Sequence, residues 1–278
     1  MSDIPSPTTG DLAHLRSLLF APGSDERKLR SALTSGADAV VADLEDAVVP
    51  ARKDAARELV ARVRPPLVRV NGADTSWFAG DLALVRSLEL DAIVLPKATP
   101  EAVAALGSSG PPVVAIVETA AGVRTTYEIA SAPRVAALIL GAVDLGAEVG
   151  LEPRRDGLEL LYARSKIVFD SVAAGIRAPF DVVHLDVRDD DGLEAECRLA
   201  RSLGFGGKVC IHPAQLGVVH RVFAPSEEEL DWARGIVDAF EAGSAAGRGA
   251  VALNGAMVDR PVVERAKRLL AESEEPEP

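Results

Sequence analysis

Short β-rich apolar runs alternate with longer amphipathic segments along most of this chain. A typical amphipathic segment, DERKLRSALTSG at 25–36, places charges on one helical face and Leu and Ala on the other. Glycines at positions 36, 107 and 204 stand where such helices should end in a left-handed residue. The alternation indicates repeated βαβ units around a parallel sheet. We predict strands at 16–20, 38–43, 67–70, 91–95, 112–117, 135–140, 180–184 and 205–211.

Eight such strands can form either a closed barrel or an open doubly wound sheet. No G-x-G-x-x-G follows the first strand, and 278 residues with 48% hydrophobic content suit a barrel of roughly 250 residues. The predicted fold class is therefore α/β, a (β/α)₈ TIM barrel with a short C-terminal helical extension. We expect a disordered N-terminus over 1–12, the barrel over 13–243, and a linker with a C-terminal segment over 244–278.

The C-terminal region reads as a helix at 226–241, a Gly/Ala/Ser linker, a turn at Asn254-Gly255 and a last helix introduced by Asp259 and Pro261. The segment is too small to fold alone. It must pack on its own barrel or on a neighbouring subunit.

Composition excludes several classes of protein. The net charge is −12, from 42 acidic and 30 basic residues, which argues against nucleic acid as a partner but leaves room for a local phosphate pocket. Cys197 and Cys210 are the two cysteines, in a sequence without a secretory signal, so we expect a reducing, cytoplasmic compartment. No apolar run reaches the ~18 residues that cross a membrane.

Acidic residues stand at several predicted strand ends, where barrels carry their chemistry. Glu118 directly follows PVVAIV, and Asp144 comes just after VAALILGA on the next strand. Adjacent strands lie ~4.8 Å apart, so two carboxylates can share one hard cation. We predict a Mg²⁺ site here. Asp43 and Asp46 follow the second strand, and a helix N-cap is an equal reading for each.

Other polar residues leave alternatives open. Arg69 lies in the apolar run LVRVNG and needs an anionic partner, either a protein acid or a substrate carboxylate. Lys97, in VLPK, could form a Schiff base, but the acids favour a supporting role. His184 and His212 fall at strand ends and are better read as hydrogen-bonded rim residues than as ligands. The chain contains no zinc spacing and no G-x-S-x-G motif.

These segments resemble the CitE-like branch of the HpcH/HpaI aldolase/citrate lyase superfamily, from residue 16 to about 270. The resemblance is carried by the order and spacing of RSLLFAPGS, GADAVVADLEDAV, VRVNG, VLPKA, IVETAAGV, GAVDLGAEVG, KVCIHPAQL and GAMVDRPVVERA. It implies a metal-dependent lyase with a TIM-barrel fold that assembles as a trimer or hexamer.

The resemblance also implies roles for single residues. Glu118 and Asp144 match Mg²⁺ ligands, and Arg69 matches an arginine that binds the oxo-acid carboxylate and stabilises the enolate-like charge. Asp259 matches a catalytic aspartate lent to the adjacent subunit, although a helix N-cap is its other reading. We expect further substrate contacts from Glu45, Asp46, Gly141 and Ala142.

The RSLLFAPGS loop resembles a coenzyme A contact. Its expected cofactor-binding residues are Phe20, Lys28 and Arg30, and Arg27 is a further basic residue that could bind phosphate. Asp25 departs from the pattern, because it stands where some malyl-CoA lyases carry an arginine.

The leading functional hypothesis is a Mg²⁺-dependent lyase that cleaves a malyl-CoA or citramalyl-CoA type of β-hydroxyacyl-CoA into a 2-oxo acid and acetyl-CoA. An alternative is a citrate lyase β subunit, which cleaves a citryl group on an acyl carrier protein to oxaloacetate. A non-catalytic sensor of oxo acids is a third. A pyruvate-dependent aldolase is less favoured, because that branch uses a histidine near the second strand, where this chain has Leu44-Glu45-Asp46.

Overall fold

The computed structural model describes residues 12–245, 247–253 and 255–273. The chain divides into two compact units, Met1–Phe223 and Ala224–Pro278. This boundary comes earlier than residue 243, where we expected the barrel to end, because helix α11 (Glu227–Ala245) belongs to the second unit. The expected disordered N-terminus lies outside the described residues except for Leu12.

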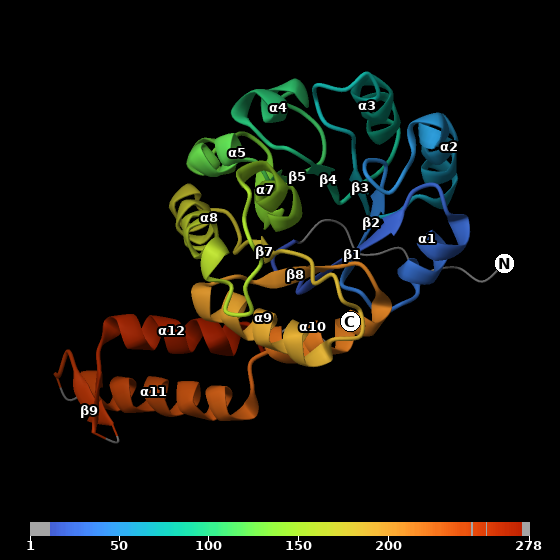
Figure 1. Ribbon diagram of the computed structural model, residues 1–278. Helices are drawn as coiled ribbons and strands as arrows, with labels where there is room; N and C mark the ends of the chain where they lie inside the picture. The colour runs from blue at the N-terminus through green and yellow to red at the C-terminus, as the bar shows by residue number, and fades with distance from the viewer. Residues whose placement is uncertain (1–11, 246, 254, 274–278) are drawn as a thin grey trace. The chain divides into compact units, whose positions relative to one another are not determined.

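Eight parallel strands close into a barrel in the first unit, in the order of the chain, with β8 pairing back onto β1 (Figure 1). The predicted barrel is thus confirmed, with strand ends within two residues of expectation except in β7. There the backbone leaves the ladder after Asp181, and Val182 and Val183 line a cavity instead. The strands are β1 Ser17–Pro22, β2 Ala39–Asp43, β3 Leu67–Arg69, β4 Ala92–Leu95, β5 Val113–Val117, β6 Val135–Leu140, β7 Phe180–Asp181 and β8 Gly207–Cys210.

Helices surround these strands in Figure 1. They are α1 Glu26–Leu33, α2 Lys53–Val63, α3 Phe78–Arg86, α4 Pro100–Ala105, α5 Ala120–Arg124, α6 Thr126–Ala130, α7 Ala142–Val149, α8 Leu161–Ala174, α9 Asp190–Leu203 and α10 Leu216–Phe223, with 3₁₀ turns at Pro50–Arg52, Leu158–Leu160 and Pro213–Gln215. Gly204 ends α9 with a φ of 103°, a left-handed conformation that carries no Cβ penalty in glycine. In the described residues no helix is both long and apolar enough to span a bilayer.

The strands are buried on both faces, and alternate residues belong to different cores. One cluster joins strand residues to helix residues such as Leu29 and Ala56, so it fills the space between barrel and helices. The other consists almost entirely of strand residues and fills the barrel interior; it includes Leu18, Val41, Leu67, Ile116 and Ile139. Side chains on a strand repeat every second residue. The next inward positions are therefore Phe20, Asp43, Arg69, Glu118 and Gly141, at the carboxyl ends of five strands.

The second unit consists of α11, a hairpin of β9 (Val251–Leu253) and β10 (Ala256–Val258), and α12 (Arg260–Ala271). It has a small apolar core of its own, which includes Ala233, Ile236 and Val263. Asp259 caps α12, because its carboxylate accepts a hydrogen bond from the Val262 N–H at 3.4 Å. Residue 254 of the predicted turn lies outside the described residues.

Candidate active site

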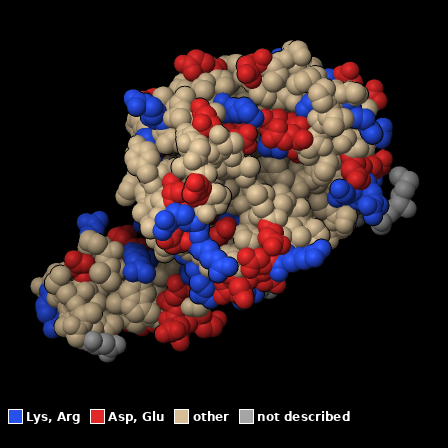
Figure 2. Space-filling model, viewed as in Figure 1, with Lys and Arg blue, Asp and Glu red and all other residues tan. Residues whose placement is uncertain are grey.

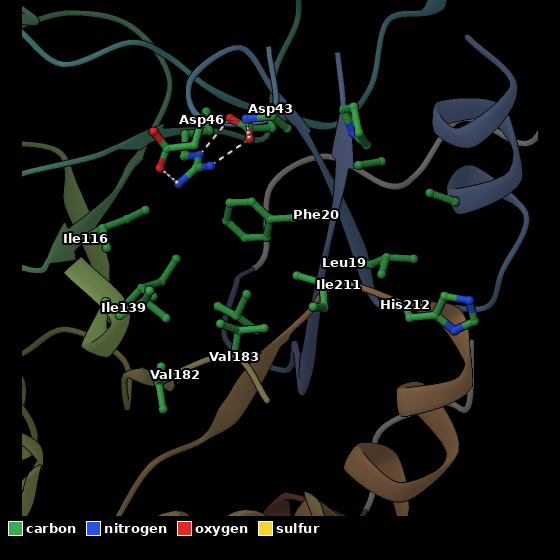
Figure 3. Close-up of a pocket in the computed structure, with 18 of the residues that line it drawn as sticks. Leu19, Phe20, Asp43, Asp46, Ile116, Ile139, Val182, Val183, Ile211 and His212 are labelled. Carbon is green, nitrogen blue, oxygen red and sulfur yellow. Dashed lines mark hydrogen bonds and ion pairs between the residues drawn. The ribbon is translucent and has the colours of Figure 1, made fainter. Parts of the chain in front are cut away.

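A cavity of about 780 Å³ opens at the carboxyl ends of the barrel strands. In Figure 3, Asp43 and Asp46 lie at one end of it and His212 at the other, with the Phe20 ring between them and Ile116, Ile139, Val182 and Val183 along one side. Acidic and basic side chains gather side by side on this face of the barrel unit in Figure 2. Of the residues expected at the site, the cavity is lined by Phe20, Lys28, Asp46, Arg69, Glu118, Gly141, Ala142 and Asp144.

Glu118 is held in place by both neighbouring strands. Its Oε1 accepts the backbone N–H of Lys97 at 2.7 Å, after β4. On the other side, β5 and β6 pair Val117 with Leu140, so Gly141 lies beside Glu118. A Cβ on residue 141 would come within 2.6 Å of Glu118 Oε2. Glycine is therefore required here, because a side chain at 141 would occupy the space that Glu118 fills.

Asp144 lies in the first turn of α7 and is partly exposed. Its Oδ1 is 3.9 Å from Lys97 Nζ. No group of three or more metal-ligating side chains occurs among the residues that the structure describes. Two carboxylates are nevertheless a sufficient protein contribution for Mg²⁺, which keeps several waters or substrate oxygens in its octahedron. A zinc-type cage, by contrast, needs more protein ligands.

The electrostatics of Glu118 favour a bound cation. Burial raises the pKa of its carboxyl to about 7, and the charges of Glu45 and Asp144 add to the rise. The Lys97 N–H and ammonium oppose it without cancelling it. A carboxylate that is buried among other carboxylates is stabilised in its ionised form when a cation lies between them.

Arg69 has protein partners as well as a face on the cavity. Its Nε and Nη2 donate to the two oxygens of Asp43 at 2.7 and 2.6 Å, and its Nη1 lies 3.0 Å from Glu45 Oε2. Burial lowers the pKa of Arg69, but Asp43 and Glu45 outweigh burial and the net shift is upward. Of the two open alternatives, a protein acid is the observed partner. The guanidinium also lies 5.2 Å from the Phe20 ring centre.

Lys97 lies between two acidic residues of the site, Glu45 and Asp144. Its Nζ donates to Glu45 Oε1 at 2.7 Å, and Glu45 in turn contacts Arg69. Although burial lowers the pKa of Lys97, the hydrogen bond and charge of Glu45 raise it above its ordinary value. An ammonium with a raised pKa is a poor Schiff-base nucleophile, because the neutral amine is required. The structure therefore agrees with the supporting role.

The expected coenzyme A residues separate into two groups. Phe20 and Lys28 line the cavity together with Arg27, from β1 and the first turn of α1. Arg30 does not line it; its Nε donates to Glu26 at 2.9 Å on the exposed face of α1. Asp25 caps α1 by accepting the Lys28 N–H at 3.0 Å, which explains an aspartate at that position.

The remaining sequence expectations divide in a similar way. Glu45 is buried behind the cavity wall, where it contacts Arg69 and Lys97, whereas Asp46 lines the cavity directly. His212 lines the far end and caps a 3₁₀ turn, with its Nδ1 3.2 Å from the Ala214 N–H. His184 is hydrogen-bonded through Nδ1 to Glu196 at 2.9 Å. Both histidines are thus hydrogen-bonded as expected.

Sequence reasoning missed the anchor of Arg69 and the apolar wall of the cavity. The sequence allows Asp43 to be a helix cap, but in the structure its carboxylate binds Arg69 and accepts the N–H groups of Glu45 and Ala47. Asp43 stands two residues after Val41, which faces the barrel interior, and this spacing indicates that Asp43 also faces inward. Val182 and Val183 fall in the predicted strand 180–184 but lie beyond the end of β7 and line the cavity. The apolar sequence is the same in either case, so it does not distinguish the two positions.

Gly141→Ala is expected to weaken Mg²⁺ binding by about 10- to 100-fold, because the new methyl group displaces the Glu118 carboxylate. Isothermal titration with Mg²⁺ measures this. Gly146→Ala, in the helix that Gly141 precedes, is the control, since a Cβ there meets only Leu151 Cβ at 3.9 Å. Equal Mg²⁺ affinity in both variants would contradict the assigned position of Glu118.

Comparison with known proteins places this architecture in an enzyme family. Residues 16–213 match the model of the HpcH/HpaI aldolase/citrate lyase family, and the chain belongs to that family. It is 37% identical to citrate lyase subunit beta of Leuconostoc mesenteroides subsp. cremoris, over 92% of each chain. It is 38% identical to (3S)-malyl-CoA thioesterase of Cereibacter sphaeroides, over 93% of this chain and 94% of that protein.

A solved structure agrees over almost the whole chain. The protein CitE of Mycobacterium tuberculosis, in complex with magnesium, acetoacetate and coenzyme A, superposes with a TM-score of 0.83 at 36% identity. The match covers 97% of this chain and 100% of that one. The resemblance inferred from the sequence motifs is confirmed.

Proposed function

We propose that this protein is a Mg²⁺-dependent carbon–carbon lyase that cleaves a malyl-CoA or citramalyl-CoA type of β-hydroxyacyl-CoA into a 2-oxo acid and acetyl-CoA. The observation that carries the proposal is the convergence of Glu118, Asp144 and Arg69 on one cavity at the barrel mouth. The magnesium, acetoacetate and coenzyme A bound by the CitE relative support it.

Glu118 and Asp144 are the residues that would hold Mg²⁺. Hard carboxylate oxygens suit this ion, and the raised pKa of Glu118 and the glycine beside its Oε2 fit a cation there. When bound, the ion would act as a Lewis acid on oxygens of the substrate.

The other residues would bind and orient the thioester. Arg69, fixed by Asp43, would present a permanent positive charge to the oxo-acid carboxylate. Arg27 and Lys28 line the cavity at the start of α1 and would supply the positive charge for a phosphate. The apolar side formed by Ile139 and Val183 would exclude water from the enolate.

Asp259 is the proposed base. It would accept the proton of the β-hydroxyl while the carbon–carbon bond breaks, leaving its electron pair on the acetyl thioester as an enolate that is then protonated at carbon. Asp259 lies in the second unit of the chain, whereas Glu118 and Asp144 lie in the first. We propose that it acts in the site of a neighbouring subunit, within a homotrimer or hexamer.

Mixing two inactive variants tests this shared site. When each variant is assayed by itself, Asp259→Asn and Glu118→Gln should both show a kcat about 10²-fold or more below that of wild type. Co-refolded mixtures should regain a substantial part of wild-type activity, because some sites then combine an intact Glu118 with an intact Asp259. Steady-state rates of the mixture against each variant measure the effect. A mixture no more active than its components would contradict sharing between subunits.

Product analysis tests the proposed reaction. Purified protein with Mg²⁺ and malyl-CoA or citramalyl-CoA should release glyoxylate or pyruvate, detected as the phenylhydrazone, together with acetyl-CoA. A thioesterase, the activity named for one relative, would release free coenzyme A thiol and the hydroxy acid instead. Activity unchanged by EDTA would overturn the metal role.

The alternative proposal is a citrate lyase β subunit acting on citryl-acyl carrier protein, because one relative at 37% identity bears that name. The same residues would serve, and oxaloacetate would be the oxo acid. Turnover of citryl-carrier protein with no turnover of free CoA thioesters would favour this alternative.

A further inference from the structure

Lys53 is a buried lysine whose three ammonium protons all have acceptors next to the candidate active site. Its Nζ lies 2.7 Å from the carbonyl oxygens of Leu44 and Glu45 and 2.6 Å from Asn71 Oδ1. The residue is only 5% exposed, and Nζ also lies 5.0 Å from the centre of the Trp77 ring. Lys53 does not line the cavity that Glu118 and Asp144 line.

A chain of hydrogen bonds continues from Lys53 through Asn71 to the outer helices α3 and α2. Asn71 follows β3 and donates through its backbone and side-chain N–H groups to Asp81 Oδ2, at 2.7 and 2.6 Å. Asp81, on α3, also accepts Arg57 Nη1 of α2 at 2.8 Å. Asn71 and Asp81 are each at most 1% exposed. Lys53 therefore ties the segment after β2 to the segment after β3.

These two segments carry residues of the site. Glu45, whose carbonyl oxygen is bound by Lys53, directs its carboxylate to Arg69 Nη1 at 3.0 Å and to Lys97 Nζ at 2.7 Å. Arg69 stands two residues before Asn71. Burial of an ammonium has a desolvation cost that an apolar side chain of similar size would not have, so Lys53 is not explained by space-filling alone.

We propose that Lys53 is a positioning residue of the active site, which clamps the Leu44 and Glu45 carbonyls to Asn71 so that Glu45 holds Arg69 where the oxo-acid carboxylate binds. The proposal rests on the proposed function, because it assumes that Arg69 binds that carboxylate. If Lys53 positions Arg69, its loss weakens oxo-acid binding. If Lys53 only stabilised the fold, its loss would leave oxo-acid binding in the folded protein unchanged.

Lys53→Met keeps the length of the side chain and removes the three donors. With Mg²⁺ present, its Kd for pyruvate should rise by about tenfold or more, while its Kd for coenzyme A stays within about twofold of wild type. Isothermal titration measures both constants, and thermal melting measures the stability of each variant.

Arg134→Met is the matched control. Arg134 likewise clamps backbone carbonyls, those of Pro111 and Gly107 at 2.7 and 2.8 Å, but it stands directly before β6, at the opposite end of the barrel from the site. This variant should lose stability and keep both Kd values. A pyruvate Kd that rises equally in both variants would overturn the positioning role.

Asn71→Ala is the second variant and keeps Lys53 in place while removing one of its acceptors. It should raise the pyruvate Kd in the same direction, by about threefold or more, and it decides the matter if Lys53→Met does not fold. Unchanged pyruvate affinity in the folded variants overturns the positioning role alone. If wild-type protein binds glyoxylate and not pyruvate, the same comparison is made with glyoxylate. Wild-type protein that binds neither oxo acid in the presence of Mg²⁺ overturns the proposed function itself.

Discussion

Replacing Glu118 by glutamine is expected to lower kcat/KM by about 10³-fold, because a Lewis acid supplies several kcal/mol and each 1.36 kcal/mol is a factor of ten. The amide keeps the size of the side chain and an oxygen that can accept the Lys97 N–H now 2.7 Å from Oε1. The variant should therefore remain folded while losing its affinity for Mg²⁺. Steady-state kinetics over a range of Mg²⁺ concentrations measures the loss.

Glu148→Gln is the control for this substitution. Glu148 lies on α7 with Asp144, is exposed, and accepts the Ala120 N–H at 2.7 Å, a bond that glutamine can also accept. It should retain wild-type kinetics. If Glu118→Gln kept its activity at millimolar Mg²⁺, the metal assignment would be wrong.

The pH dependence of stability gives a second readout of Glu118. In the metal-free protein its pKa is raised from 4.5 to about 7, so the folded state binds this proton more tightly than the unfolded state does. Stability should therefore fall as pH rises from about 4.5 to about 7, by about 3 kcal/mol in total, and stay low above that range. Glu118→Gln should lack this slope, and Mg²⁺ should offset it in wild-type protein. Denaturant unfolding at each pH measures both effects.

Arg69→Met is expected to damage stability and activity together. It leaves Asp43 and Glu45 buried without their common partner, a loss of about 3–5 kcal/mol when one member of a buried pair is removed. The oxo-acid carboxylate would also lose its cation, so kcat/KM should fall by about 10²- to 10³-fold even where the variant is folded. Arg69→Lys should recover part of the charge but not the paired bonds to Asp43.

Arg164→Met separates the two effects. Arg164 also binds a buried aspartate through two bonds, to Asp181 at 2.9 and 3.2 Å, but does not line the candidate active site. Its loss should lower stability in chemical denaturation and leave KM for the oxo acid in the condensation direction unchanged. If the KM for the oxo acid in Arg69→Met were also equal to that of wild type, Arg69 would serve only the stability of the fold.

The sequence predicted much of this molecule because its physical signals are local. Alternating apolar residues with period two mark strands, and glycines mark helix ends, so eight strands and the left-handed Gly204 could be predicted without tertiary information. The two carboxylates of the expected metal site followed from position alone. Parallel strands end at one edge of a barrel, so Glu118 and Asp144 had to come together.

Contacts between distant segments could not be read in this way. Whether Arg69 faces a protein acid or only a ligand depends on the register of β2 and β3, which places Asp43 opposite Arg69. Arg30, expected to contact the cofactor, does not line the cavity, because the face of α1 turned to the cavity carries Arg27, Lys28, Ser31 and Ala32 and Arg30 lies off that face. A run of basic residues does not say which of them faces inward.

By itself, the sequence determined the barrel and the position of its carboxylates, because strand period and strand direction set both. Only the tertiary structure decided that Gly141 leaves room for Glu118, that Lys97 and Arg69 share Glu45, and that Lys53 clamps the segment behind them. Most of those contacts join residues on different strands, and the side-by-side packing of β2, β3 and β4 and of β5 and β6 brings them within hydrogen-bond distance.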